Sequence, residues 1–213
     1  MPSTQTYREY ALMRGQIVDW SEFISENGWA DEHQFKDSAL PEKCIAVYYL
    51  VDKQEKLVVD RATVITYDAR YKEEFKELNL TWVKQFFEVE ESDIRQLCSP
   101  EESILQPGGE IFFILDSRGV VTGVVADVIH NGVCELAKMT VRKECTGKGY
   151  ANILMREAIQ WAKDKSYPFI ELYSSVQLEN AIALYKKFGF QTIHLGQHPS
   201  YKRCSIIMKL EFD

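Results

Sequence analysis

The feature that most constrains the fold is a run of three consecutive predicted β-strands in the middle of the chain. The apolar segment 110–115 is typical of a buried strand, and it ends in a polar turn that contains Gly119. Residues 120–129 form the next predicted strand, and the Asn131-Gly132 pair after it is a strong hairpin signal that leads into residues 133–141. These signals predict an antiparallel meander.

Helices and further strands are predicted on both sides of this meander. Apolar residues at helical spacing predict helices around residues 75–86, 154–162 and 181–188, the last closed by Gly189. The additional strands are expected at residues 63–67, 169–174, 190–195 and 204–212. The order of these elements predicts an α/β protein whose mixed, largely antiparallel sheet is flanked by helices.

The first sixty residues differ from the rest of the chain. Val18, Trp20 and Phe23 are compatible with a short helix, and residues 45–50 and 56–60 are compatible with a β-hairpin. We therefore expect an N-terminal extension over residues 1–60 and a main domain over residues 61–213.

Composition and charge exclude several classes of protein. Hydrophobic residues make up 46% of the chain and charged residues 27%, which are ordinary values for a globular protein. Lys and Arg number 25 against 32 Asp and Glu, and the net charge of −7 argues against a nucleic-acid partner and favours amine-bearing partners. The five scattered cysteines predict neither a disulfide framework nor a metal site. Without a visible signal peptide or a membrane-spanning run, we expect a cytoplasmic protein with no membrane contact.

A glycine-containing loop joins the strand ending at Val141 to the helix that follows it. Its sequence is Thr146-Gly147-Lys148-Gly149-Tyr150-Ala151. Glycines at such a junction let backbone N–H groups face outward, and the helix N-terminus adds a partial positive charge. Considered alone, the loop is compatible either with a pyrophosphate site or with a turn that binds no ligand, because Asn152 replaces the third glycine of a dinucleotide fingerprint.

A second motif, Ala-Ile-Ala-Leu-Tyr-Lys-Lys-Phe-Gly-Phe at residues 181–190, begins about thirty residues beyond the end of the loop. With this motif, the loop and the order of elements, residues 62–213 resemble the GNAT family of N-acetyltransferases. The segment Glu-Leu-Ala-Lys-Met at residues 135–139 resembles a bacterial-type subgroup of that family. The resemblance implies the GNAT acyl-CoA N-acyltransferase fold, in which strands of an open sheet splay apart, and it implies acetyl-CoA as the co-substrate.

The resemblance also implies a coenzyme A site built largely from backbone groups. The residues at the matching positions are Met139, Thr140, Val141, Thr146, Gly147, Lys148, Gly149, Tyr150 and Ala151. Two positions depart from the family pattern, because Glu144 replaces a Gln or Arg and Leu178 replaces the usual Asn. Positive charge for the phosphates would then come from Lys148 and from Arg142 or Lys143.

Two residues are candidates for acid and base catalysis. By the resemblance, Tyr185 is the general acid, because a phenol with a pKa near 10 can donate its proton to a departing thiolate. By the same resemblance, Glu135 is the candidate general base, because it lies six residues before Val141, where the histone-acetylating branch of the family carries its glutamate base. A strand would place Glu135 on one face with Ala137, Met139 and Val141, and apolar neighbours would raise its pKa. The alternatives are core packing for Tyr185 and an ion pair with a cation such as Lys138 for Glu135.

Four further residues fall in segments that wall the acceptor site in the family. They are Asn79, Trp82, Tyr201 and Arg203, although packing or a solvated charge would equally explain them. The resemblance implies direct acetyl transfer to a primary amine in a ternary complex, with a small molecule or a protein lysine as acceptor, and it is compatible with a homodimer. Two alternatives stay open, which are an acyl-CoA-binding module acting through residues 1–60 and an acyltransferase for a longer acyl chain.

Overall fold

A computed structural model describes residues 7–13, 16–19, 60–199 and 201–212. Over these residues, nine strands form one sheet in the order β2-β1-β3-β4-β5-β6-β7-β9-β8. The strands are β1 (Tyr7–Met13), β2 (Gln16–Asp19), β3 (Asp60–Thr66), β4 (Glu110–Leu115), β5 (Val121–His130), β6 (Val133–Val141), β7 (Phe169–Ser174), β8 (Gln191–Leu195) and β9 (Ile206–Glu211). The helices are α2 (Lys72–Phe86), α3 (Glu91–Cys98), α4 (Tyr150–Asp164) and α5 (Glu179–Lys187), with short turns η2 (Ala69–Tyr71), η3 (Glu101–Leu105) and η4 (Lys143–Cys145).

The sheet is mixed and mostly antiparallel, which confirms the predicted fold class. Strands β3 to β6 form the antiparallel meander, whereas β6 and β7 run parallel. In the described part of the chain, β6 and β7 pair only at Cys134↔Ile170 and Glu135↔Glu171, although β6 continues to Val141. The sheet therefore opens between β6 and β7 beyond Glu135, as expected for splayed strands.

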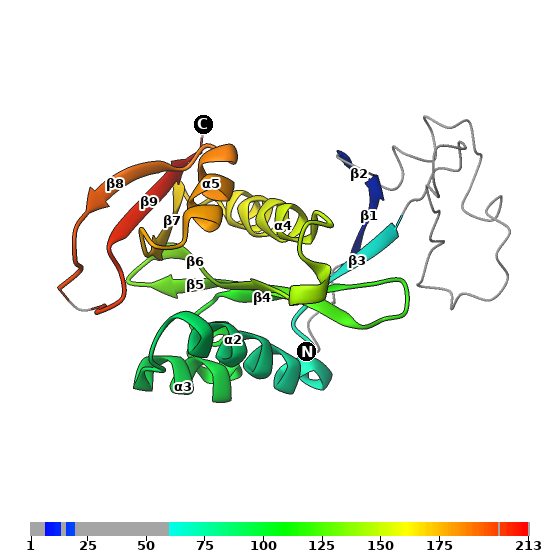
Figure 1. The fold of residues 1–213 in the computed structure, drawn as a ribbon, viewed down its shortest axis with the longest axis horizontal. Coiled ribbons are helices and arrows are strands. Elements are labelled where there is room, and N and C mark those ends of the chain that lie inside the picture. The colour runs from blue at the N-terminus through cyan, green and yellow to red at the C-terminus, as the bar shows by residue number, and fades with distance from the viewer. Residues whose placement is uncertain (1–6, 14–15, 20–59, 200, 213) are drawn as a thin grey trace, which may run out of the picture.

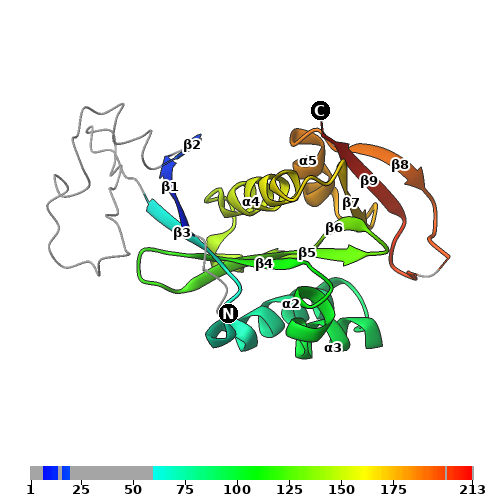
Figure 2. The same cartoon turned by 180° about the vertical axis from the view of Figure 1, so that it is seen from behind.

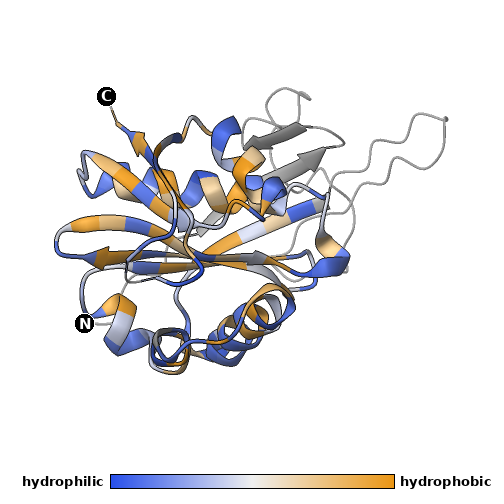
Figure 3. Ribbon diagram, turned by 60° about the vertical axis from the view of Figure 1, so that its left-hand side comes forward, coloured by the Kyte–Doolittle hydropathy of each residue, from blue (hydrophilic) through white to orange (hydrophobic). Residues whose placement is uncertain are grey.

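Each face of the sheet is covered by helices. Figures 1 and 2 show α4 and α5 on one side of the sheet and α2 and α3 on the other. Phe112 and Ile114 of β4 pack in the core under α4, whereas Ile111 and Phe113 pack in the core under α2 and α3. Burial on both faces explains why β4 is apolar at nearly every position, and Figure 3 shows hydrophobic residues concentrated along the central strands.

A β-bulge interrupts β6 at the site where it leaves β7. The register of β5 and β6 changes from Ala126↔Ala137 to Val124↔Thr140, so that β6 carries one extra residue over this interval. Lys138 within the bulge has a φ of 53°, which is unusual for a residue other than glycine.

The bulge corrects the expected alternation of side chains along β6. Met139 and Val141 pack against the core on the α4 side, as do Cys134 and Leu136, whereas Ala137 packs against the core on the α2 side. The prediction that Glu135, Ala137, Met139 and Val141 share one face is therefore wrong, because the extra residue shifts the alternation by one position.

The structure also contains elements that the sequence did not predict. Helix α3 begins with a capping box, in which the Glu90 side chain accepts from the Asp93 backbone and the Asp93 side chain accepts from the Glu90 backbone. Val18 lies in β2 rather than in a helix, and β1 joins the sheet by pairing with β3. Trp20 and Phe23 lie outside the described residues. Of the hairpin expected at residues 45–50 and 56–60, Asp60 is the first residue of β3, and the remainder lies outside the described residues.

The described cysteines, Cys98, Cys134, Cys145 and Cys204, are free thiols. None of the helices within the described ranges has the length and apolar character needed to span a membrane.

Candidate active site

A cavity lies where β6 and β7 diverge, between α2 and α3 on one side and α5 on the other. Of the candidate residues, Asn79, Trp82, Met139, Tyr185 and Arg203 line it. The remaining described lining residues are Val83, Phe87, Asp93, Leu97, Leu136, Ala137, Lys138, Tyr173, Ser174, Ser175, Leu178 and Ala181. Residues from four separate stretches of the chain thus meet at the opening of the sheet.

Tyr185 extends from α5 into the wall of this cavity. Its side chain is hydrogen-bonded to that of Ser174 at the end of β7, and its ring lies 6.1 Å from that of Phe190 between centroids. Burial raises the pKa of Tyr185 to about 12, which outweighs the opposite effect of the Ser174 hydrogen bond. The phenol therefore stays protonated at neutral pH and is available as a proton or hydrogen-bond donor.

The glycine-containing loop leads directly into α4. Gly147 has a φ of 81° and Gly149, the N-cap of α4, a φ of 93°, a region in which residues other than glycine are strained. A Cβ at Gly147 would meet nothing within 4 Å, so the space beside the loop is open. The first N–H groups of an α-helix have no intrahelical acceptor, and α4 directs them to the loop side. This geometry fits a bound phosphate group.

The other predicted residues around the loop divide into exposed and buried groups. Thr146 and Lys148 are exposed beside the glycines, as is Lys143 in η4. The Tyr150 side chain is only 1% exposed and packs in the core, so Tyr150 has only its backbone N–H to offer a ligand. Arg142 donates its Nε–H to the Val121 carbonyl at 2.5 Å, which ties this cation to β5.

The two departures from the family pattern occupy different environments. Glu144 is exposed in η4, close to where phosphates would bind. Leu178 is the N-cap of α5 without a side-chain capping bond, and it lines the cavity beside Ala181 and Tyr185. With Leu178 in place of the usual Asn, this wall of the cavity is more apolar.

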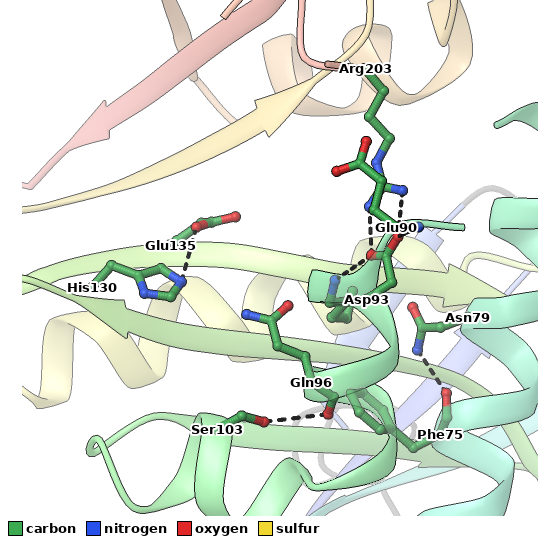
Figure 4. Close-up of polar contacts among 10 residues, drawn as sticks. Phe75, Asn79, Glu90, Asp93, Gln96, Ser103, His130, Glu135 and Arg203 are labelled. Carbon is green, nitrogen blue, oxygen red and sulfur yellow. Dashed lines mark hydrogen bonds and ion pairs between the residues drawn. The ribbon is translucent and has the colours of Figure 1, made fainter. Parts of the chain in front are cut away.

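Glu135 lies just behind the cavity, at the last position where β6 pairs with β7. It is absent from the described lining residues, whereas Ala137 and Tyr173, two residues further along β6 and β7, line the cavity. Figure 4 shows the His130 side chain directed at Glu135, and the distance from His130 Nε2 to Glu135 Oε2 is 3.7 Å. On β7, Glu171 is the residue paired with Glu135. Burial raises the pKa of Glu135 to about 7, with a smaller opposing effect of Lys138.

Lys138 does not form the alternative ion pair with Glu135, because it pairs with Asp93 instead. Lys138 Nζ lies 3.0 Å from Asp93 Oδ1, and Lys138 acts on Glu135 only through its charge. Burial and the Lys138 charge lower the pKa of His130, so its imidazole carries little charge at neutral pH. Glu135 therefore has a strongly perturbed carboxyl without a strong cation partner.

Asp93 is the centre of an ion-pair network that the sequence did not reveal. Its carboxylate accepts two hydrogen bonds of 2.6 Å from Arg203 and one of 3.0 Å from Lys138, of which Figure 4 shows the Arg203 contacts. Although burial alone would raise the pKa of Asp93, these cations lower it to about 2. The network joins the start of α3 to the β6 bulge and to the segment before β9.

The candidate acceptor residues are placed on both sides of this network. Asn79 is buried and donates its Nδ2–H to the Phe75 carbonyl at 2.8 Å, and the Trp82 ring lies 5.9 Å from that of Phe87. Tyr201 does not belong to the described cavity lining, but its ring lies 5.7 Å from that of Tyr173, which does. Asn79 and Trp82 thus meet Arg203 at the cavity, and Tyr201 lies behind Tyr173.

Sequence reasoning missed Asp93, Tyr173 and the contribution of Lys138. The local sequence around Asp93 indicates at most the start of a helix. Its pairing with Arg203 has no local signal, because the two residues lie 110 positions apart. For Tyr173, the predicted strand at residues 169–174 gave the alternation but not which face opens to the cavity.

Comparisons with known proteins identify the family and the fold. Residues 72–190 match the profile of the family described as the Acetyltransferase (GNAT) family. An uncharacterized N-acetyltransferase of Schizosaccharomyces pombe is 32% identical over 107 residues, which covers 48% of this chain and 64% of that protein. The chain therefore spans less than two thirds of the length of this curated relative.

Solved structures share the fold at lower sequence identity. A GNAT-family acetyltransferase from Staphylococcus aureus superposes with a TM-score of 0.64 at 22% identity, covering 71% of this chain and 99% of that one. Spermidine N-acetyltransferase from Vibrio cholerae, solved in complex with CoA and spermine, gives a TM-score of 0.56 at 20% identity and covers 70% of this chain and 95% of that one.

Proposed function

Because this chain belongs to the Acetyltransferase (GNAT) family, we propose that it transfers an acetyl group from acetyl-CoA to the nitrogen of a primary amine. The observation that carries the proposal is the position of Tyr185, which lines the cavity at the opening between β6 and β7. The acceptor class is a small amine or a lysine side chain, and transfer is direct, without an acyl-enzyme.

The loop and the N-terminus of α4 supply the groups that would hold the phosphates of acetyl-CoA. Gly147 and Gly149 leave the backbone N–H groups accessible, and the exposed Lys148 adds positive charge. Backbone groups around Met139, Thr140 and Val141, which do not pair with β7, would align the acyl-bearing arm. The role of Glu144 is to make this site less positive, which predicts weaker phosphate binding than a Gln or Arg would give.

Tyr185 and Glu135 would handle the two protons of the reaction. A primary amine with a pKa near 10.4 is almost entirely protonated at pH 7, so a base must remove a proton before or during attack. Glu135 would accept that proton through water, because it is not among the described lining residues of the cavity, whereas Ala137 and Tyr173 are. Tyr185 would donate a proton or a hydrogen bond to the sulfur as the carbon–sulfur bond breaks.

The test is the rate of CoA release from acetyl-CoA in the presence of an amine panel, measured with a thiol reagent. Tyr185→Phe is expected to lower kcat about a hundredfold or more while leaving the affinity for CoA nearly unchanged, because general acid catalysis contributes about 10²–10⁴-fold. Tyr71→Phe is the matched control, since Tyr71 lies in η2 and packs against Phe113 on the other face of the sheet. Equal rates for Tyr185→Phe and the control would contradict the assignment of Tyr185.

Three further expectations belong to this proposal. We place the catalytic unit within residues 61–213 and regard residues 1–60 as an extension, which deletion of those residues would test. A homodimer would be consistent with β8, an edge strand whose residues are all exposed and include Ile193 and Leu195. The cytoplasm is the expected location of the reaction, because acetyl-CoA is its donor.

A further inference from the structure

The charges in the cavity are opposite in sign to the charge of the whole chain. Among the described residues that line the cavity, the charged ones are Asp93, Lys138 and Arg203. Two cations and one carboxylate give 2 − 1 = +1, whereas the chain has a net charge of −7. The overall acidity therefore does not describe the environment that an acceptor would meet.

Asp93 has no hydrogen-bonding capacity left for a cationic substrate. Its Oδ1 accepts from Lys138 Nζ at 3.0 Å and from Arg203 Nη2 at 2.6 Å. Its Oδ2 accepts from Arg203 Nη1 at 2.6 Å and from the Glu90 backbone N–H at 3.2 Å. A carboxylate offers about four lone-pair sites, and all of them are used. The second ammonium group of a diamine or polyamine would therefore find no available carboxylate at Asp93.

The two cations, in contrast, keep donors that Asp93 does not use. Arg203 has five N–H donors and gives two to Asp93, and Lys138 has three and gives one. Their side chains are 26% and 13% exposed, and both line the cavity. A guanidinium beside an ammonium is a favourable arrangement for binding a carboxylate.

Glu90 faces Arg203 from outside the cavity. Figure 4 shows its carboxyl group beside Arg203, and its charge raises the pKa of that guanidinium after the larger effect of Asp93. The Glu90 side chain caps α3 by accepting from the Asp93 backbone, and it is not among the described lining residues. Glu90 therefore moderates the positive charge without occupying the cavity.

Apart from Asn79 and Tyr173, the acceptor side of the cavity around Arg203 is largely apolar. Trp82, Phe87 and Leu97 line it, and the Arg203 guanidinium carbon lies 5.9 Å from the centre of the Phe87 ring. An acceptor that reaches Arg203 would therefore place an apolar group against these side chains.

We propose that the acceptor is a small amine that also carries a carboxylate and an apolar side group, and that Arg203 and Lys138 bind this carboxylate. Amino acids and their derivatives have this chemistry. The inference names the acceptor class of the acetyl transfer proposed above, and it rests on that function.

The decisive experiment compares phenylalanine with phenethylamine, which differ only by the carboxylate, and includes spermidine as a polyamine. Because hydrogen bonds to charged groups contribute about 1.5–3 kcal/mol, kcat/KM for phenylalanine should exceed that for phenethylamine by about ten- to a hundredfold. Spermidine should be the poorer substrate. Equal values for the matched pair, or faster turnover of spermidine, would overturn the inference.

A binding measurement separates failure of this inference from failure of the proposed function. Calorimetry with the products N-acetylphenylalanine and N-acetylphenethylamine requires no acetyl transfer. Tighter binding of the acid without any turnover would support the carboxylate site and count against the transferase function. Turnover without a preference for the acid in either assay would refute the carboxylate site and leave the transferase function standing.

Arg203→Gln tests whether this side chain reads the carboxylate. The ratio of kcat/KM for phenylalanine to that for phenethylamine should fall about tenfold, whereas a purely structural defect would lower both values and leave the ratio unchanged. Arg118→Gln is the matched control, because Arg118 is 78% exposed and pairs with Asp116 in the turn between β4 and β5. Arg203→Lys, which retains the charge, should recover part of the ratio and serves if the glutamine variant does not fold.

Discussion

Replacement of Glu135 by Gln provides a direct thermodynamic test of the candidate base. Burial raises the pKa of Glu135 to about 7 from an ordinary value of 4.5. Below pH 4.5 the carboxyl is protonated in the folded and the unfolded chain, so its ionisation affects neither. Between pH 4.5 and 7 the unfolded chain releases this proton while the folded protein keeps it, and stability is lost as pH rises.

The size of this loss follows from the shift in pKa. One pKa unit corresponds to about 1.4 kcal/mol, so the shift from 4.5 to about 7 lowers the free energy of unfolding by about 3 kcal/mol once both states are ionised. The Glu135 side chain is 17% exposed, so solvent screens it only weakly. Gln cannot ionise, so the variant does not undergo this loss. The free energy of unfolding of Glu135→Gln minus that of the wild type should therefore increase by about 3 kcal/mol from pH 4.5 to pH 8.

The assay is urea denaturation followed by tryptophan fluorescence over this pH range, with Glu73→Gln as a control. Glu73 is 69% exposed on α2, and its replacement should change stability by less than about 0.5 kcal/mol at every pH. The ionisable neighbours His130, Lys138 and Glu171 are the same in both proteins. Repeating the comparison in a His130→Gln background removes the ionisable group paired with Glu135. A difference between Glu135→Gln and wild type that stays constant from pH 4.5 to pH 8 would refute the raised pKa and, with it, the argument for Glu135 as a base.

Three further substitutions, one of them with a matched control, give independent expectations. Gly147→Ala and Gly119→Ala both place a Cβ at a positive φ with open space around it, so each should cost about 1 kcal/mol in thermal stability, but only Gly147→Ala should weaken CoA binding in calorimetry. Asp93→Asn leaves Lys138 and Arg203 without their buried carboxylate and should cost about 3–5 kcal/mol in urea denaturation, and a loss below 1 kcal/mol would contradict the central place of Asp93. Asp127 is buried, its carboxyl oxygens have no hydrogen-bond partner within the described residues, and burial raises its pKa. In urea denaturation, Asp127→Val should therefore stabilise the protein by about 1–3 kcal/mol at pH 7. Destabilisation would show that the carboxyl has an unrecognised role.

Features with local sequence signals were predictable. The apolar run of β4 and the Asn131-Gly132 hairpin each specify their structure within a few residues, and β4, β6 and β7 coincide with their predicted ranges. The glycines before α4 likewise signal the positive φ values that the loop adopts. The order of these elements predicted the fold class, whereas the splayed sheet and the choice of Tyr185 as a site residue came from the family resemblance.

Features that depend on contacts between distant segments were not predictable. Helix α3 has little apolar content apart from Ile94 and Leu97, and its stability depends on packing Leu97 against the core under α2. The pair of Asp93 and Arg203 joins residues 110 positions apart, and nothing in either local sequence indicates the other.

The bulge at Lys138 shows most clearly how such a distant contact shapes the site. A lysine in the left-handed region is strained by about 1–2 kcal/mol, and a period of two along β6 gives no sign that one residue is extra. The hydrogen bond that Lys138 Nζ donates to Asp93 Oδ1 offsets this strain, because without it the buried carboxylate would have one hydrogen-bond donor fewer. The bulge at Lys138 therefore shifts Met139 and Val141 to the α4 side of the sheet and changes the register between β5 and β6 close to where β6 leaves β7. It also brings the Lys138 cation into the cavity. The proposed acceptor and acyl sides of the cavity are therefore linked through one backbone position, and a substitution at Lys138 should alter both acceptor preference in the amine panel and CoA affinity in calorimetry.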